Sequence, residues 1–284
     1  MGQEFIYKMR DKSIYLNSNV ELMGIINITP DSFYDGGNYL DRDSALDRVQ
    51  ELVENGASII DIGGESSRPN SDPVHINEEI KRILPVLKSM KGKFSVPVSV
   101  DTYKSEVASV ALSEGADIIN DISALRFDPK LPGVISDYDA GVILMHMKGT
   151  PKNMQDHPEY VNVIDEISSF LSERAEFATS SGISRDSIMI DPGIGFGKTL
   201  KHNLSILKGI DQFKQLGYPV LIGPSRKSFI GELTNKSVEE RLFGTAGVVA
   251  YCTLKGVNVI RVHDVPQMKD VVNLTHSIEK AELV

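Results

Sequence analysis

Short apolar runs rich in β-branched residues recur along the whole chain, and each ends in polar or glycine-rich residues. Several are apolar along most of their length, as in SIMIDPG at 187–193. Such runs are expected for parallel β-strands that are buried on both faces. The pattern predicts eight strands, at residues 20–27, 57–64, 97–103, 116–122, 141–147, 187–193, 219–225 and 257–263.

The segments between these runs follow a helical period. In residues 41–56, apolar side chains repeat at helical spacing, and Gly56 lies where a helix would terminate. Residues 105–115 and 201–217 show the same pattern, and each ends in glycine just before a strand. Strands therefore alternate with helices along the chain.

Eight alternating units without a break in composition predict a single α/β domain over residues 1–284, a (β/α)₈ TIM barrel. Barrels of this type routinely reach this length as one domain. An open doubly wound sheet is the alternative. Residues 5–16, FIYKMRDKSIYL, look like a short extra β-hairpin. We expect this hairpin to cap the N-terminal mouth of the barrel.

Charge and composition narrow the class of partner. The chain has 30 Lys and Arg against 39 Asp and Glu, a net charge of −9, which argues against nucleic acid and anionic membranes. Its one cysteine, Cys252, allows no disulfide framework and fits a reducing compartment. No apolar run is long enough to span a bilayer, and the first residues contain no signal-peptide core. We therefore expect a cytoplasmic protein.

Polar residues stand where the predicted strands end. Barrel enzymes build their sites from the C-terminal ends of the strands, so these side chains are expected to meet over one mouth of the barrel. A single such residue often only caps a helix or closes a turn, but the whole set points to a site. The strand-end residues are Asn27, Asp61, Asp101, Asn120, His146, Asp191, Ser225, Lys227, Arg261 and His263.

The chemistry of this set favours an organic ligand over a protein-held metal cluster. An Asp beside an Asn suits a flat heterocycle with an amino-pyrimidinone edge, because the carboxylate accepts from adjacent N–H groups and the amide matches a mixed edge. Lys227, Arg261 and His263 form a local positive cluster that fits a phosphate or carboxylate. Loops 27–37 and 65–73 have the composition of lids, carrying Phe33, Ser67 and Arg68.

The stretch DPGIGFGKT at 191–199 ends like a P-loop. That motif needs a glycine five positions before its Gly-Lys pair, so that backbone N–H groups surround phosphates. The position here is Pro192, which has no N–H. The sequence therefore argues against a phosphate loop and gives Lys198 no role.

Seven segments together resemble the dihydropteroate synthase family, the folate-pathway target of sulfonamides. They appear in the family's order and spacing over about residues 20–266. The segments are MGIINITPDSFYDGG, DIGGESSRP, VSVDTYKSEV, IINDIS, DPGIGFGK, GPSRKSFIG and RVHDV.

The resemblance implies an enzyme that joins 6-hydroxymethyl-7,8-dihydropterin pyrophosphate to p-aminobenzoate, with Mg²⁺ assisting, and releases dihydropteroate and pyrophosphate. It further implies a homodimer, binding of sulfonamide inhibitors, and C–O cleavage ahead of attack by the arylamine. The implied catalytic residues are Asp101, Asp191 and Lys227. The implied pterin site is Asp101, Asn120, Ile122, Met145, Asp191 and Lys227; the p-aminobenzoate site is Ser67, Arg68, Pro69, Phe196, Ser225 and Lys227; and the pyrophosphate site is Asn27, Arg261 and His263, with Asn27 also at the metal.

Two positions depart from the family pattern, and two other functions stay open. Ser67 stands where the family usually has Thr, and Asn70 where it usually has Gly, which bears on sulfonamide and p-aminobenzoate affinity. A pterin-dependent methyltransferase would share the barrel and the pterin contacts. It would not account for the segment 225–227, the Arg-Pro pair at 68–69 or the segment 261–263. A catalytically silent paralogue is the other alternative.

Overall fold

The computed structural model describes residues 4–17, 19–28, 40–69 and 71–282. Eight parallel strands form one sheet in the order β8-β7-β6-β5-β4-β3-β10-β9. A parallel bridge between Ile190 and Val220 joins its two edges, so that the eight strands form a nearly closed barrel. The (β/α)₈ prediction is confirmed, and the open sheet is wrong. The strands are β3 (Glu21–Asn27), β4 (Ile59–Gly63), β5 (Val98–Asp101), β6 (Ile118–Asp121), β7 (Gly141–Met145), β8 (Ile188–Asp191), β9 (Leu221–Ile222) and β10 (Val259–Val262).

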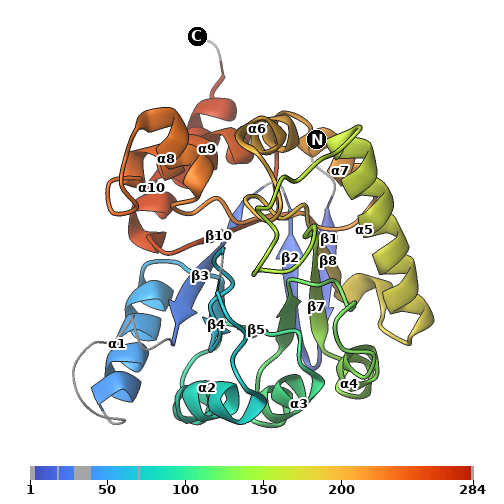
Figure 1. Ribbon diagram of the computed structural model, residues 1–284. Coiled ribbons are helices and arrows are strands. Elements are labelled where there is room, and N and C mark those ends of the chain that lie inside the picture. The colour runs from blue at the N-terminus through green and yellow to red at the C-terminus, as the bar shows by residue number, and fades with distance from the viewer. Residues whose placement is uncertain (1–3, 18, 29–39, 70, 283–284) are drawn as a thin grey trace.

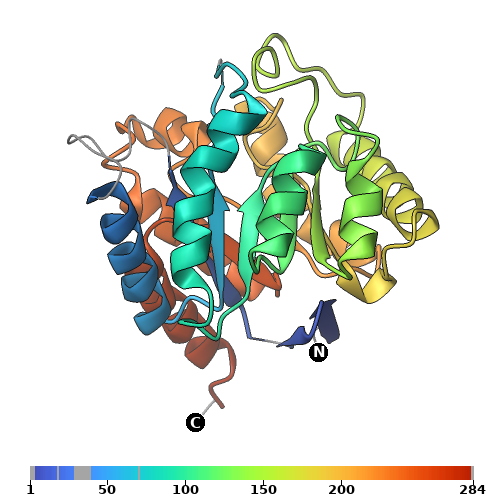
Figure 2. The same ribbon diagram turned by 90° about the horizontal axis from the view of Figure 1, so that it is seen from below.

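Helices surround the barrel (Figures 1 and 2). In α1, Val49 and Leu52 are buried, as the helical spacing predicted, and Gly56 adopts a φ of +92° just after the helix. No helix in the described part of the chain is long and apolar enough to cross a membrane. The helices are α1 (Leu40–Glu54), α2 (Ile76–Met90), α3 (Ser105–Ser113), α4 (Leu131–Asp137), α5 (Val163–Ser180), η1 (Arg185–Ser187), α6 (Leu200–Lys208), α7 (Ile210–Lys214), α8 (Ser228–Thr234), α9 (Leu242–Leu254) and α10 (Val265–Glu279).

The predicted N-terminal hairpin is present and plugs the barrel. Strands β1 (Phe5–Met9) and β2 (Lys12–Leu16) pair antiparallel, and they lie at the lower end of the barrel in Figure 2. Tyr7 is fully buried, and its hydroxyl donates to the Val142 carbonyl at 3.2 Å. A Cβ on Gly141 would lie 2.7 Å from that hydroxyl oxygen, so the plug requires glycine there. The hairpin packs on inward residues of seven strands: Met23, Ile59, Ile118, Ile143, Met189, Leu221 and Val259.

The alternation of side chains along each strand explains why polar strand-end residues lie inside the barrel. Side chains two residues apart on a strand face the same side. The residue two positions after each strand residue that contacts the hairpin therefore also faces the barrel interior. Nearest the hairpin this interior is apolar. At the next inward positions toward the carboxyl ends, Asp61, Asn120, Asp191 and Arg261 are polar, whereas Ile25 and Met145 are apolar. The fold thus separates a stabilising apolar layer from a polar mouth.

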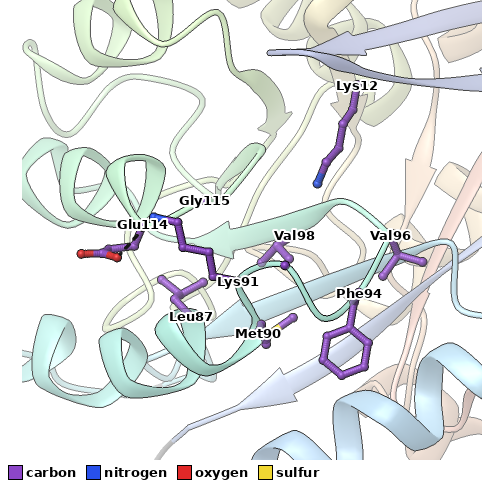
Figure 3. A pocket seen from close by; sticks show the side chains of 10 residues that line it. Lys12, Leu87, Met90, Lys91, Phe94, Val96, Val98, Glu114 and Gly115 are labelled. Carbon is purple, nitrogen blue, oxygen red and sulfur yellow. Dashed lines mark ion pairs between the residues drawn. The ribbon is translucent and has the colours of Figure 1, made fainter.

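A small hollow lies at the amino ends of the strands, between the hairpin and the ends of α2 and α3 (Figure 3). It holds about 70 Å³, room for about two water molecules. Its charged side chains already have partners. Lys12 lies 2.9 Å from Asp117, and Lys91 lies 3.7 Å from Glu114.

Candidate active site at the carboxyl ends of the strands

An arginine between two carboxylates occupies the centre of the mouth. Arg261 Nε donates to Asp61 Oδ2 at 2.6 Å, and its Nη2 donates to Asp101 Oδ2 at 3.1 Å. Asn120 Nδ2 lies 3.4 Å from the same Asp61 oxygen. Asp61 is fully buried, and its Oδ1 has no hydrogen-bond partner among the described residues. The sequence identified Asp61 as a strand end but assigned it no function. The structure shows that it anchors Arg261.

Burial changes the protonation equilibria of the groups around this arginine. Burial raises the pKa of Asp101 to about 7, although the charge of Arg261 opposes the change. Burial likewise raises the pKa of Asp191 to about 6, against the hydrogen bond that its Oδ1 accepts from Gly193 N at 2.7 Å. Burial, reinforced by Arg261, lowers the pKa of Lys227 to about 8. Perturbed groups that converge in one mouth are typical of an active site.

A second polar group lies beside the first. Ser225 Oγ lies 2.8 Å from His263 Nδ1, and Asn27 Nδ2 lies 3.4 Å from His263 Nε2. Burial, with the charge of Arg261, lowers the pKa of His263 to about 4, so its imidazole is neutral at pH 7. The structure thus brings together residues for which the family resemblance implied contacts to pyrophosphate and to p-aminobenzoate. The uncharged histidine acts here as a hydrogen-bonding group.

An apolar cluster, called here the apolar wall, borders these polar groups: Met145 pairs in register with Asp191, and the Phe196 ring lies against Lys227. Met145 and Ile122 cluster with Phe196, as the resemblance implied for packing against flat rings. The wall continues through Tyr103 and Phe127, whose rings meet edge to face with centroids 5.4 Å apart. Met147 and Met154 complete the cluster. A planar ligand bound in the mouth would have polar partners at its edge and this cluster against its face.

The lysine of the glycine-rich segment after β8 binds backbone carbonyls, which argues further against a phosphate loop. Lys198 is buried, and its Nζ donates to the carbonyls of Phe196 at 2.8 Å and His146 at 3.2 Å. Lys198 thus holds the loop that carries Phe196, a role that the sequence did not reveal. A Cβ on Gly193 would lie 2.0 Å from the His146 carbonyl oxygen, and its φ is +70°, so the close approach requires glycine.

His146 is a strand-end residue that the sequence placed wrongly. It follows the inward Met145, so alternation turns it toward the helices. Its ring meets Phe170 edge to face, with centroids 4.8 Å apart, and its Nδ1 lies 3.0 Å from Lys198 Nζ. Burial lowers its pKa to about 2. His146 therefore supports the loop behind the site.

The loop after β4 stands at the rim of the mouth. Ser67 is half-buried, while Arg68 and Pro69 are exposed to solvent. Arg68 and Pro69 are thus not packed into the mouth in this structure, in contrast to Phe196, which is buried. Phe33, most of loop 27–37 and Asn70 lie outside the described residues.

Comparisons with known proteins agree with this geometry. The family described as pterin binding enzyme matches residues 23–263. A dihydropteroate synthase of Streptococcus pyogenes is 42% identical over 93% of this chain and 97% of the relative. The dihydropteroate synthase of Yersinia pestis, solved with a sulfonamide drug, superposes with a TM-score of 0.92 at 36% identity, covering 98% of this chain and 100% of that one. The dihydropteroate synthase of Xanthomonas albilineans, solved with 4-aminobenzoic acid, superposes with a TM-score of 0.91 at 37% identity. The match covers 99% of this chain and 100% of that one. With matches over nearly its whole length, this chain belongs to the dihydropteroate synthase family of pterin-binding enzymes.

Proposed function

We propose that this chain joins 6-hydroxymethyl-7,8-dihydropterin pyrophosphate to p-aminobenzoate, giving 7,8-dihydropteroate and pyrophosphate. One observation carries the proposal. Buried Asp and Asn side chains converge at the mouth with two cations and face an apolar wall. This combination suits a flat polar heterocycle that carries an anionic leaving group. The relatives of known structure were solved with a sulfonamide and with 4-aminobenzoic acid, which supports the same ligands here.

The pterin occupies the inner part of the mouth in this proposal. Asn120 and Asp191 bind its amino-pyrimidinone edge, because an amide and a carboxylate together match its donors and acceptors. Asp101 lies on the adjacent strand, since Asp101 and Asn120 are paired in register. Met145 and Ile122 pack against the face of the ring.

The p-aminobenzoate lies nearer the rim. Phe196 packs against its ring, and Lys227 and Ser225 lie on the polar side. Ser67, Arg68 and Pro69 approach from the loop after β4, where Arg68 offers a cation for the carboxylate. Because Arg68 is exposed in this structure, its contact requires the loop to move toward the mouth. Sulfonamides, as analogues of p-aminobenzoate, compete for the same place.

The reaction breaks the bond between the exocyclic methylene carbon and the pyrophosphate oxygen, and it forms a bond from that carbon to the arylamine nitrogen. The nitrogen then loses a proton to solvent. The carboxylates of Asp101 and Asp191 favour the positive charge that develops on the pterin. Arg261 and His263 lie where the pyrophosphate departs, and the guanidinium stabilises the growing negative charge. Preorganised charges of this kind are commonly the largest contribution to catalysis.

Magnesium fits this mouth only together with the substrate. Among the described residues, no three His, Cys, Asp or Glu side chains form a metal site. Asn27 turns its amide nitrogen toward His263 and offers its amide oxygen to a cation. Mg²⁺ is commonly held by one or two protein oxygens, water and substrate phosphates. We therefore propose that Asn27 and the pyrophosphate hold it jointly, where it would supply charge neutralisation for the leaving group.

The proposed homodimer has a candidate interface on the last two helices. Large apolar side chains on α9 and α10 are exposed, with Phe243 at 86%, Leu274 at 64% and Ile278 at 66%. The two helices lie side by side (Figure 1). Exposed apolar surface of this kind marks interaction sites. Phe243→Asp combined with Leu274→Asp should convert the dimer to a monomer in analytical ultracentrifugation, and a monomeric wild-type protein would refute the proposal.

The deciding experiment measures pyrophosphate release from the dihydropterin pyrophosphate, with Mg²⁺, in the presence and absence of p-aminobenzoate. The expected result is release accompanied by dihydropteroate. Asp101→Asn, which keeps the shape of the side chain and removes its charge, should cut turnover by orders of magnitude. A wild-type protein that binds the pterin but releases no pyrophosphate would favour the methyltransferase or the silent paralogue.

A further inference from the structure

A buried ionic network lies at the base of the loop after β4, outside the substrate contacts proposed above. Lys104 Nζ lies 2.5 Å from Glu65 Oε2 and 2.5 Å from Glu79 Oε2. The side chains of Lys104, Glu65 and Glu79 are only 12%, 10% and 1% exposed. Tyr103 adds a hydrogen bond to Glu65 Oε1 at 2.8 Å. The network joins the loop after β4, helix α2 and the segment just after β5.

Glu65 and Lys104 also bind the far end of the loop, at Val74. Glu65, at its start, accepts from the backbone N–H of Val74 at 2.7 Å. Lys104 donates to the Val74 carbonyl at 2.6 Å. Both backbone polar groups of Val74 are thus held by one ion pair, and the start and end of the loop are fixed to each other. Loops of this length with adjoining ends form compact units packed by their own side chains.

The segment between these ends is also held internally. Ser71 Oγ lies 2.6 Å from the Ser66 carbonyl oxygen and 2.8 Å from that of Arg68, so its one hydroxyl proton is shared between them. A loop with a fixed base and internal hydrogen bonds moves as one body, so the base decides where its tip arrives. Arg68 and Pro69 lie near that tip.

We infer that Lys104 and Glu65 are positioning residues, which clamp Val74 and thereby direct Arg68 to p-aminobenzoate. The inference rests on the proposed function for the role of Arg68. The ion pair is buried, and removing one partner of a buried pair leaves an uncompensated charge and a strong structural effect. Lys104 and Glu65 touch no substrate in this scheme. They act by holding a binding group within the small tolerance that a site requires.

The test replaces Lys104 with Met, which keeps length and removes the donor. The Lys104→Met enzyme should show a KM for p-aminobenzoate raised by about tenfold, with kcat and the KM for the pterin substrate within about twofold. Lys104→Arg should restore much of the loss. Lys152→Met is the matched control, because Lys152 pairs with Asp72 of the same loop but is 72% exposed. That control should change KM by less than about twofold.

Hydrogen–deuterium exchange in the ligand-free full chain tests the clamp on Val74 without an activity assay. Exchange at residues 66–74 should accelerate in Lys104→Met and stay unchanged in Lys152→Met. If Lys104→Met does not fold, Glu65→Gln, which keeps the side-chain shape and removes the charge of the ion pair, should give the same exchange pattern on a smaller scale. Unchanged exchange, or equal losses for both substrates, overturns the inference. Arg68→Ala separates the two ideas: a normal KM in that variant would refute the proposed role of Arg68, while the exchange data would still decide the clamp.

Discussion

Lys227 Nζ lies 4.0 Å from the centroid of the Phe196 ring. The contact joins the loop after β9 to the loop after β8, so a cation and an aromatic face meet at the rim of the mouth. Such a pair gains electrostatic attraction, more so when desolvated. It also explains how a lysine can remain beside a developing pterin cation: the ring and the nearby Asp191 and Asp101 partly offset its charge.

Lys227→Met should separate activity from stability. The variant loses a cation at the mouth, so dihydropteroate formation should fall by about a hundredfold or more. Because burial already disfavours the charged lysine, the free energy of unfolding should stay equal or rise. Steady-state assays and urea denaturation measure the two effects. Lys201→Met, at an exposed position, is the control, and near-normal turnover in Lys227→Met would remove this lysine from the site.

Asp61→Asn should lower both the stability of the protein and its turnover. Arg261 would keep only Asp101 as a carboxylate partner, and breaking a buried pair costs about 3–5 kcal/mol. The free energy of unfolding, from denaturant titration, should fall by about this amount, and turnover should fall with it. Asp186→Asn breaks the exposed pair with Lys8 and should cost less than about 1 kcal/mol. Equal small effects in both variants would contradict the anchoring role of Asp61.

The raised pKa of Asp101 predicts a pH effect on the ligand-free protein. Between about pH 4 and pH 7 the native state holds a proton on Asp101 that the unfolded state has released. Its contribution to stability is therefore present at low pH and is lost as the pH rises through about 7. The lowered pKa values of His146 and His263 act in the opposite direction. Subtracting the Asp101→Asn profile from the wild-type profile isolates the effect, and a flat difference would contradict it.

Lys198→Met should weaken p-aminobenzoate binding. Sequence analysis assigned this residue no role, but its side chain donates to the carbonyls of Phe196 and His146. Without them the Phe196 loop should loosen, and the KM for p-aminobenzoate should rise by about three- to tenfold. The KM for the pterin substrate is the internal reference. A large loss of affinity for the pyrophosphate moiety instead would revive the phosphate-loop interpretation.

Tyr7→Ala should reduce stability and leave catalysis intact in the folded fraction. Tyr7 is fully buried in the plug, and deleting a large aromatic side chain from a core costs about 3–5 kcal/mol. Tyr7→Phe removes only the hydrogen bond to Val142 and should cost about 1 kcal/mol. Thermal unfolding measures the loss of stability, and kcat measured below the unfolding transition measures catalysis. A fall in kcat at full folding would mean that the hairpin influences the mouth.

Several features could be predicted from the sequence because they depend on local pattern. Strands buried on both faces must be apolar along their length, so runs such as 187–193 were recognisable, and so was the barrel that their alternation with helices implies. The polar strand ends were visible for the same reason. Alternation alone could also have corrected His146, because its neighbour Met145 was already assigned to the interior.

Other features were decided by tertiary structure. Asp61 and Arg261 are 200 residues apart in sequence, and only the pairing of β3 with both β4 and β10 brings their strands close enough for the side chains to meet. The inward turn of Lys198 and the clamp on Val74 depend on which loops meet above the strands. Burial of charged groups depends on everything packed around them. The sequence alone determined which chemical groups the mouth would contain, because composition and periodicity are local. The structure decided which of these groups pair with each other, support a loop or stay free to bind, because those relations depend on distances across the barrel.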